Sequence, residues 1–280
     1  VLSKDPNFCF CSTYEALTPN VFLSTGGITK KILSWAMPPT RPQDNVEAGA
    51  DKPSEEEFAM GNMSNTSLTH GYYFPESIFN VFDESVVFEK DKVKNTKHWQ
   101  QHFDYFLKKL SYKNNGKQLL LKSPANTGRI KEILELYPDA CFIHIHRNPY
   151  TVYQSNINLY EKILPLLSFQ KVDNKWIEDF ILFSYEKTYR KFLADKKEVP
   201  INQFFEMSYA DFVAAPLEQL QKAYAHLNLG DFEKATLFLK EEINEVKDYK
   251  TNNYSTLDGE TKNMVTAKWQ FMFDTYNYLR

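Results

Sequence analysis

LLLKSPANTGRIKEILELYPDACFIHIHRNPYTVYQS, residues 119–155, contains the pattern that decides the fold. A short apolar run at 119–121 is followed by a turn, by apolar residues at helical spacing from Ile130 until Pro138, and by a second strand-like run at 142–146. A strand, a helix and a strand within about 30 residues form a βαβ unit. We expect its two strands to be parallel neighbours joined by a right-handed crossover. The pattern therefore predicts an α/β fold.

The rest of the chain adds elements of both kinds. We predict helices at 96–112, from about Pro149, around 174–194 and from about Tyr209, and a strand at 204–208. Together these elements predict an open parallel sheet flanked by helices. We expect residues 1–280 to form a single domain, with a long surface excursion at about 38–57, where four prolines stand among charged residues.

Composition and charge limit the classes of function. The chain has 280 residues and a formal net charge of −3, and it contains no long basic block, so we expect no nucleic-acid partner. No apolar run approaches the ~20 residues of a membrane helix, so we expect no integral membrane segment. Cys9, Cys11 and Cys141 have neither a disulfide framework nor zinc spacing, which predicts a reducing, cytoplasmic location. The composition leaves the oligomeric state open.

Polar side chains follow each of the three predicted strands. In open parallel sheets, ligands bind beyond the carboxyl ends of the strands. Lys122, Arg147 and Tyr209 stand directly after these ends in the sequence. We therefore expect their side chains to face one crevice.

The junction at Arg147 has the features of an anion site. Asn148 can cap the following helix and Pro149 fits its first position, so Arg147 lies beside a helix N-terminus, which favours anions. Ser155, eight residues after Arg147, is predicted on the same helix face as Asn148, about two turns or ~10 Å along. Arg147 and Ser155 could together bind one phosphate group. The alternative is a structural salt bridge for Arg147 and a hydrogen bond from Ser155 to its own helix turn.

The stretch at 119–155 also resembles a known family, the sulfotransferases that use 3′-phosphoadenosine 5′-phosphosulfate. The similarity is greatest to the branch with LLKSP-x-H-TGRI, FIHIHRDPY and a serine eight residues after the arginine. Further matching segments are TRPQDNV, EEEFAM, YYFPE and FFEMSYADFVAAPLEQLQKAYAHLNL. The resemblance covers nearly the whole chain and ends with Tyr249-Lys250 and the helix of Trp269.

This resemblance implies a P-loop-NTPase-like sulfotransferase fold that takes 3′-phosphoadenosine 5′-phosphosulfate as cosubstrate and needs no metal. It implies that Arg147 and Ser155 bind the 3′-phosphate, and that Tyr209 and Lys250 also belong to the nucleotide site. The acceptor would be a hydroxyl or an amine of a small molecule such as a sterol, a lipid or a phenol. Aromatic residues, 15% of the chain, would suit such a pocket or simply form the core.

The family also carries a phosphosulfate-binding loop of the form P-R-S-G-T-T, which we expect shortly before the position of Val1. VLSKDPNF, at residues 1–8, resembles the end of the helix that follows this loop. Without such a loop, the alternative is a non-catalytic protein on the same fold that binds 3′-phosphoadenosine nucleotides or acts as an interaction partner.

Three residues are candidates for catalysis. Lys122 is predicted to stabilise the transferred sulfuryl group or the leaving phosphate, with an ordinary exposed lysine as the alternative. In several branches of the family a glutamate takes the proton of the acceptor, and Glu15 falls near its place. His70 is a second candidate base, with a structural role as its alternative. Asn126 stands where LKSPAH-type members have histidine, and we expect it to cap the following helix or to orient an acceptor.

Two further histidine pairs are interpreted as structural. His144 and His146 share one strand face without a third ligand, so we predict that they are hydrogen-bonded core residues. His98 and His102 stand in HWQQH, which lacks the glutamate of the metalloprotease motif. The sequence therefore predicts no metal site.

Overall fold

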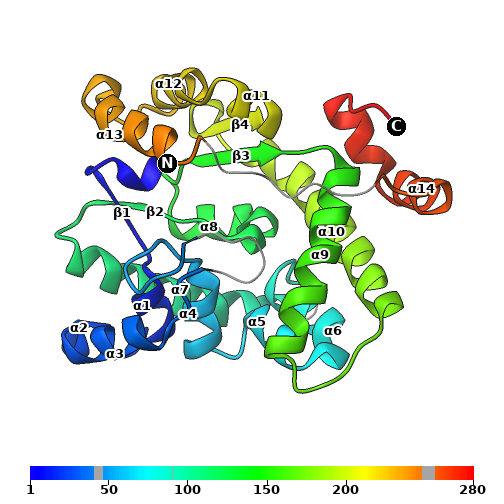
Figure 1. Cartoon of the computed structure of the whole chain (residues 1–280), viewed down its shortest axis with the longest axis horizontal. Helices are drawn as coiled ribbons and strands as arrows, with labels where there is room; N and C mark the ends of the chain where they lie inside the picture. The colour runs from blue at the N-terminus through cyan, green and yellow to red at the C-terminus, as the bar shows by residue number, and fades with distance from the viewer. Residues whose placement is uncertain (41–46, 90, 248–255) are drawn as a thin grey trace.

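The computed structural model describes residues 1–40, 47–89, 91–247 and 256–280 (Figure 1). Its α-helices are α1 (Thr13–Leu17), α2 (Phe22–Thr25), α3 (Ile28–Ala36), α4 (Glu56–Met63), α5 (Thr69–Tyr73), α6 (Ile78–Ser85), α7 (Lys92–Lys113), α8 (Ile130–Leu136), α9 (Pro149–Leu167), α10 (Asn174–Asp195), α11 (Tyr209–Ala214), α12 (Pro216–Leu227), α13 (Phe232–Glu245) and α14 (Gly259–Tyr276). Its strands are β1 (Phe8–Phe10), β2 (Gln118–Leu120), β3 (Phe142–His146) and β4 (Phe204–Ser208). Short 3-10 helices are η1 (Leu2–Lys4), η2 (Pro75–Ser77), η3 (Pro124–Gly128), η4 (Lys196–Glu198) and η5 (Ile201–Gln203).

The structure confirms the main elements predicted from the sequence. The helices expected at 96–112 and around 174–194 are α7 and α10, and the strand expected at 204–208 is β4. The helix expected from Pro149 is α9, which starts at that residue. Within the described ranges, no helix is both long enough and apolar enough to cross a bilayer.

The strands form two parallel pairs. β1 pairs with β2, with Phe8 opposite Gln118, and β3 pairs with β4, with Phe142 opposite Phe204. The expectation that the strands of the βαβ unit are neighbours is wrong for the described residues, because no ladder joins β2 to β3 there. The apolar pattern located both strands, but pattern alone does not specify which strand each one bonds to.

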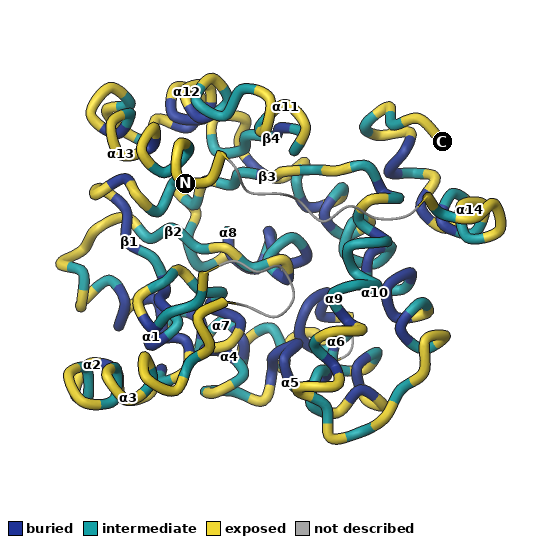
Figure 2. The backbone as a smooth tube through the Cα atoms, viewed as in Figure 1, coloured by how far each residue is buried: buried dark blue, intermediate teal, exposed yellow. Residues whose placement is uncertain are grey.

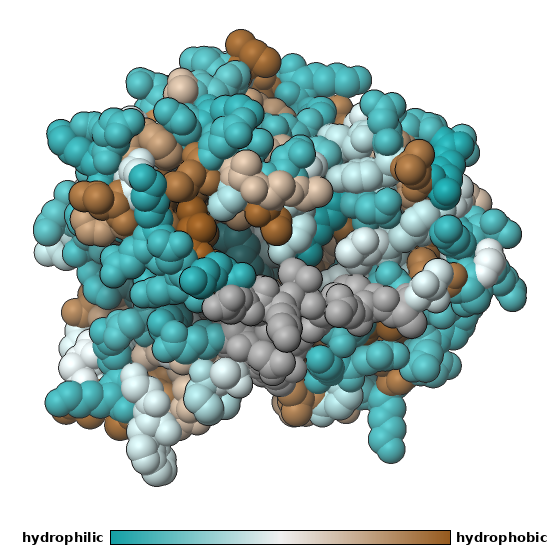
Figure 3. All heavy atoms as spheres, turned by 45° about the horizontal axis from the view of Figure 1, so that its top comes forward, coloured by the Kyte–Doolittle hydropathy of each residue, from teal (hydrophilic) through white to brown (hydrophobic). Residues whose placement is uncertain are grey.

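Buried side chains gather in two large clusters. One lies among α9, α10 and α14, where the Trp269 ring stacks on Tyr185 with centroids 3.9 Å apart. The other lies among α1, α4 and α7 and includes Trp99 and Phe103. In Figure 1 the first group of helices lies on the right and the second at the lower left. Figure 2 shows buried residues on the helices of both groups. The face seen in Figure 3 is mostly hydrophilic, with hydrophobic residues in small groups.

The stretch expected to be a surface excursion, at about 38–57, returns to the sheet at its end. Ser54 N donates a hydrogen bond to Cys11 O at 2.8 Å, just beyond β1. Glu56 and Glu57 follow in the first turn of α4, and both are buried. The last residues of this stretch are therefore part of the interior and lie near the carboxyl end of β1.

Candidate active site

Two side chains predicted to bind the nucleotide meet where β3 and β4 end. The parallel register places His146 opposite Ser208, and these are the last residues of the two strands. The next residues are therefore neighbours, and the Arg147 guanidinium carbon lies 3.3 Å from the centroid of the Tyr209 ring. This cation–π contact holds the guanidinium against the ring.

Arg147 and Ser155 have few partners among the described residues. Arg147 is exposed and has no carboxylate at ion-pair distance among the described residues. The half-buried Ser155 hydroxyl makes no hydrogen bond to any described residue. The two alternatives, a structural salt bridge and a back-bonded serine, are thus not found in this part of the chain. The start of α9 has the predicted cap, because Asn148 Oδ1 accepts a hydrogen bond from Tyr150 N at 2.9 Å. Lys250 lies outside the described residues.

Lys122 lies two residues beyond the end of β2. Its side chain is 71% exposed, and its ammonium pairs with Glu55 Oε1 at 2.5 Å. Because an exposed ion pair contributes little stability, the lysine can exchange this carboxylate for a substrate anion at small cost.

Three buried polar atoms without a hydrogen bond to the described residues lie just after β2 and at the start of α4. They are Glu56 Oε2, Ser123 Oγ and Asn126 Oδ1. Glu56 Oε1 accepts a hydrogen bond from Asn126 Nδ2, and Asn126 N donates to Ser123 O at 3.1 Å, so the three residues are connected. Buried polar groups are nearly always hydrogen-bonded, and exceptions often belong to functional sites. We call these three residues the Glu56 cluster.

The expectation that Asn126 caps the following helix is wrong. Asn126 lies inside η3, and α8 begins at Ile130 after Arg129, whose side chain makes no cap hydrogen bond. Because SPAN leads into a 3-10 helix instead of directly into α8, the Asn126 amide points to Glu56 and not to the helix N-terminus.

Burial raises the pKa of Glu56 to about 7. A backbone hydrogen bond and the Asn126 amide oppose this rise, while the neighbouring Glu55 and Glu57 add to it. A carboxyl group with a pKa near neutrality can accept a proton from a substrate hydroxyl more effectively than an ordinary glutamate.

Glu57, the next residue, is equally buried but fully paired. Arg129 donates to it from both terminal nitrogens, Nη1 to Oε2 at 2.5 Å and Nη2 to Oε1 at 3.2 Å. Arg129 Nε donates to Ser85 O, while Ser67 Oγ and Leu68 N donate to Glu57 Oε1. Burial alone would raise the Glu57 pKa, but the arginine and these hydrogen bonds lower it below its usual value. Glu57 is therefore a structural carboxylate.

Glu15 and His70, the two bases predicted from the sequence, both have partners. Glu15 Oε2 accepts hydrogen bonds from Ser12 N and Ser12 Oγ at 2.7 Å each, and Oε1 pairs with Lys113 Nζ at 2.5 Å. His70 Nε2 lies 3.0 Å from Gly61 O. Their catalytic roles stay predictions.

His144 and His146 are hydrogen-bonded interior residues, as predicted. His144 Nδ1 lies 2.9 Å from Glu206 Oε1, and His146 Nδ1 lies 2.7 Å from Tyr278 OH. Burial raises the Glu206 pKa, but hydrogen bonds from His144 and Tyr276 outweigh it and lower the pKa to about 2. These histidines stabilise the end of β3 behind Arg147.

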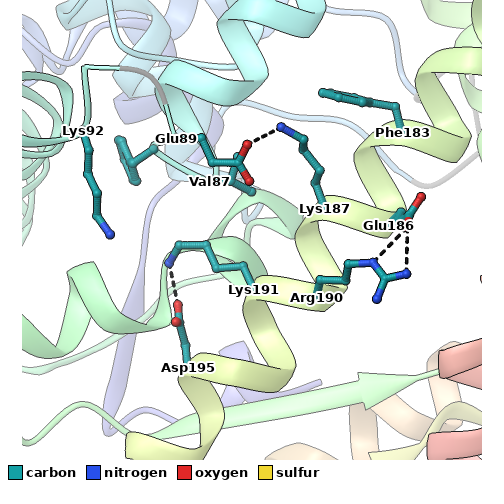
Figure 4. Close-up of a pocket in the computed structure, with 10 residues that line it drawn as sticks. Val87, Glu89, Lys92, Phe183, Glu186, Lys187, Arg190, Lys191 and Asp195 are labelled. Carbon is teal, nitrogen blue, oxygen red and sulfur yellow. Dashed lines mark hydrogen bonds and ion pairs between the residues drawn. The ribbon is translucent and has the colours of Figure 1, made fainter.

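A pocket of about 640 Å³ lies beside α10, between this helix and the segment that follows α6. Six of its charged side chains form three pairs, as the dashed lines in Figure 4 show: Lys187 with Glu89, Lys191 with Asp195, and Arg190 with Glu186. Since no strand-end residue lines this pocket, we do not assign it to the nucleotide. In the described ranges, no group of three or more His, Cys, Asp or Glu side chains could hold a metal ion.

Comparison with known proteins identifies the family. A sulfotransferase family model matches residues 37–234. The chain belongs to the sulfotransferase family. This sulfotransferase is 31% identical over 269 residues to the omega-hydroxy-beta-dihydromenaquinone-9 sulfotransferase Stf3 of Mycobacterium bovis and to the Mycobacterium tuberculosis protein of the same name. Each match covers 95% of this chain and 68% of the relative.

Solved sulfotransferase structures have the same fold. Sulfotransferase STF1 from Mycobacterium tuberculosis H37Rv superposes with a TM-score of 0.71 at 18% identity, covering 96% of this chain and 71% of that one. Sulfotransferase STF9 from Mycobacterium avium gives a TM-score of 0.73 at 19% identity, covering 98% and 71%. The α/β sulfotransferase fold expected from the resemblance is confirmed.

Two buried residues of this sulfotransferase, Glu56 and Arg129, were not predicted from the sequence. The acidic run EEE at 55–57 is typical of a solvated surface, and arginine is rarely fully buried. Two features of the sequence could have indicated their burial. The acidic run precedes the apolar residues of α4, and Arg129 lies directly before the buried Ile130.

Proposed function

We propose that this sulfotransferase transfers the sulfuryl group of 3′-phosphoadenosine 5′-phosphosulfate to a hydroxyl of a small hydrophobic acceptor. The observation that supports the donor most directly is the Arg147 guanidinium stacked on Tyr209 beside the start of α9. With one face against the ring, the guanidinium keeps N–H groups at its edge for phosphate oxygens. Ser155 adds a hydroxyl from the same helix that makes no hydrogen bond to the described residues, and we retain Lys250 from the family resemblance.

The acceptor class is suggested by the curated relatives. Their name gives an omega-hydroxy-beta-dihydromenaquinone as the molecule they act on. From this we take only the class, a hydrophobic small molecule that carries a hydroxyl group. The lipids, sterols and phenols expected from the sequence belong to it.

In the proposed reaction, Lys122 and a proton acceptor have separate tasks. A bond forms between the acceptor oxygen and sulfur, and the bond from sulfur to the 5′-phosphate oxygen breaks, so 3′-phosphoadenosine 5′-phosphate leaves. Lys122, by exchanging Glu55 for the substrate, stabilises negative charge on the moving or leaving group. The acceptor hydroxyl loses its proton to a general base.

For that base we favour Glu56. It has an oxygen without a hydrogen bond to the described residues, it lies at the start of α4 near the end of β2, and its pKa of about 7 matches the task. Glu15 and His70 are the alternative bases, although each already has hydrogen-bond partners.

A reducing, cytoplasmic setting is also part of the proposal. Cys9, Cys11 and Cys141 are all free thiols, and burial raises the pKa of each of them. Cys9 and Cys11 are buried structural thiols, while Cys141 is exposed. Three free thiols suit a compartment without disulfide formation.

The test is a transfer assay with the complete gene product, labelled phosphosulfate donor and acceptors that include hydroxylated isoprenoid quinones, sterols and phenols. Sulfated products are identified by mass. Arg147→Ala is expected to weaken binding of 3′-phosphoadenosine 5′-phosphate about 10- to 100-fold, because hydrogen bonds to a charged group are lost. The control is Arg190→Ala, which removes an exposed arginine paired with Glu186 and should leave binding unchanged.

Two outcomes would contradict the proposal. Unchanged nucleotide binding by Arg147→Ala would remove the assigned phosphate contact. Tight nucleotide binding without a sulfated product from any acceptor class would instead indicate a non-catalytic nucleotide-binding protein.

A further inference from the structure

Helix α3 turns an apolar face outward. Ile28, Ile32 and Trp35 recur at helical spacing on one side, and their exposures are 77%, 59% and 88%. On the other side, Leu33 packs against the core cluster of α1, α4 and α7. The helix therefore packs on the core through Leu33 and presents three large apolar side chains to its surroundings.

The segment before α3 also carries exposed apolar side chains. Leu17, Val21 and Leu23, at the end of α1 and in and just before α2, are also exposed. Figure 2 shows this part of the backbone, at the lower left, as largely exposed. We define the α2–α3 surface as the exposed apolar residues of this segment: Leu17, Val21, Leu23, Ile28, Ile32 and Trp35.

Exposed apolar residues also occur elsewhere, with a second group at the end of α9 and directly after α5: Leu166, Leu167, Phe169 and Phe74. Ile201 on η5 and Leu237 on α13 are as exposed but belong to separate elements, and Phe169 contacts the rings of Tyr73 and Phe74. Single exposed apolar side chains are normal on a protein surface, whereas a group of six on consecutive elements marks an interaction site.

The positive charge of this segment favours an anionic partner. Residues 16–37 contain Lys30 and Lys31 and no aspartate or glutamate, although the whole chain has a net charge of −3. Lys30 pairs with Asp51, while Lys31 is exposed. An apolar helix face with a tryptophan and adjacent lysines is the pattern of helices that lie in the interface of an anionic bilayer. A second copy docked through the same surface would bring the two exposed Lys31 side chains together, while each Lys30 is already paired with Asp51.

We propose that the α2–α3 surface docks the protein on the surface of an anionic lipid bilayer. The segment follows α1, which carries Glu15, and Tyr14 OH lies 3.0 Å from Thr25 Oγ1, so its start is tied to α1. Docking would bring the protein to the membrane in which a hydrophobic acceptor dissolves. This link to the acceptor rests on the proposed function, but the docking itself does not.

The experiment is flotation of the complete gene product with vesicles of phosphatidylglycerol and phosphatidylcholine, compared with vesicles of phosphatidylcholine alone. No donor or acceptor is added, so the result is independent of transfer activity. Wild-type protein is expected to float with the anionic vesicles and to be released by salt. Trp35→Ser and Ile32→Ser should each reduce partitioning about tenfold, because each removes a large apolar side chain from the interface.

Two further variants complete the design. Ile201→Ser removes an isoleucine of 82% exposure from a different element and should float like wild type. Lys31→Glu should weaken binding to anionic vesicles only. Absence of wild-type flotation, or equal flotation of Ile32→Ser and Ile201→Ser, would overturn the proposal. So would a dimer that Trp35→Ser converts to monomer, since the surface would then join two copies.

Discussion

Two neighbouring carboxyl groups at the start of α4, Glu56 and Glu57, share the same burial but not the same partner. Arg129 pairs with Glu57 and lowers its pKa, whereas burial raises the pKa of Glu56 to about 7 because a backbone hydrogen bond and the Asn126 amide offset it only in part. Both carboxyl groups lie in the same helix turn and both are buried. The side chain that faces each one from the segment after β2, Asn126 for Glu56 and Arg129 for Glu57, therefore decides its protonation state. A cation there makes a structural carboxylate, and an amide leaves a proton acceptor.

The largest effect is expected from Arg129→Met, which leaves Glu57 buried without its cation. Breaking a buried pair in this way should lower the free energy of unfolding by about 3–5 kcal/mol. Urea denaturation measures the loss. The double variant Arg129→Met with Glu57→Gln should recover part of it, because no uncompensated charge remains. If the losses of the two single variants simply add, the pair is not coupled as the structure indicates.

The second effect is the pH dependence of stability at Glu56. Its folded pKa of about 7 lies above the usual 4.5, so the folded protein binds the extra proton between these values and stability falls as pH rises through this window. Glu56→Gln removes this fall. Its stability relative to wild type should therefore increase from pH 4.5 to 7 by on the order of 3 kcal/mol and stay level above pH 7.

Glu57→Gln is the matched control for this measurement. The Glu57 pKa is lowered, so its contribution to stability is present above the usual pKa and is lost as pH falls below it. The variant should be less stable than wild type at neutral pH, with a deficit that shrinks in acid. Equal pH profiles for the two variants would contradict the contrast drawn between the two carboxyl groups.

The third effect is on catalysis. If Glu56 takes the proton of the acceptor, kcat/KM should rise with pH around the Glu56 pKa of about 7, because only the ionised carboxylate accepts a proton. Glu56→Gln should lower kcat/KM about 10²-fold and abolish this rise, while donor affinity stays unchanged. Glu15→Gln and His70→Gln are measured in parallel. Loss of the pH-dependent rise in one of these and not in Glu56→Gln would transfer the role to that residue.

The sequence predicted the half of the site that depends on neighbouring positions in the chain. The cap at Asn148 and the placement of Arg147 and Tyr209 follow from where strands end and helices begin, and such junctions are visible as pattern. The pairing of Glu57 with Arg129 could not be predicted, because it joins residues 72 positions apart and depends on how α4 packs against η3. For the same reason the order of the strands was missed, while their positions were found.

The two strand pairs also differ in the length of the segment that connects their strands. Phe142 pairs with Phe204 across 62 positions, whereas Phe8 pairs with Gln118 across 110. Loop-closure entropy grows with the logarithm of length, so the longer loop costs about 0.5 kcal/mol more to close. The β3–β4 pair creates the contact of Arg147 with Tyr209, and the β1–β2 pair positions the segments that carry Glu15 and Asn126. The proposed nucleotide end of the site is therefore assembled with the smaller loss of chain entropy, and the proposed acceptor end with the larger.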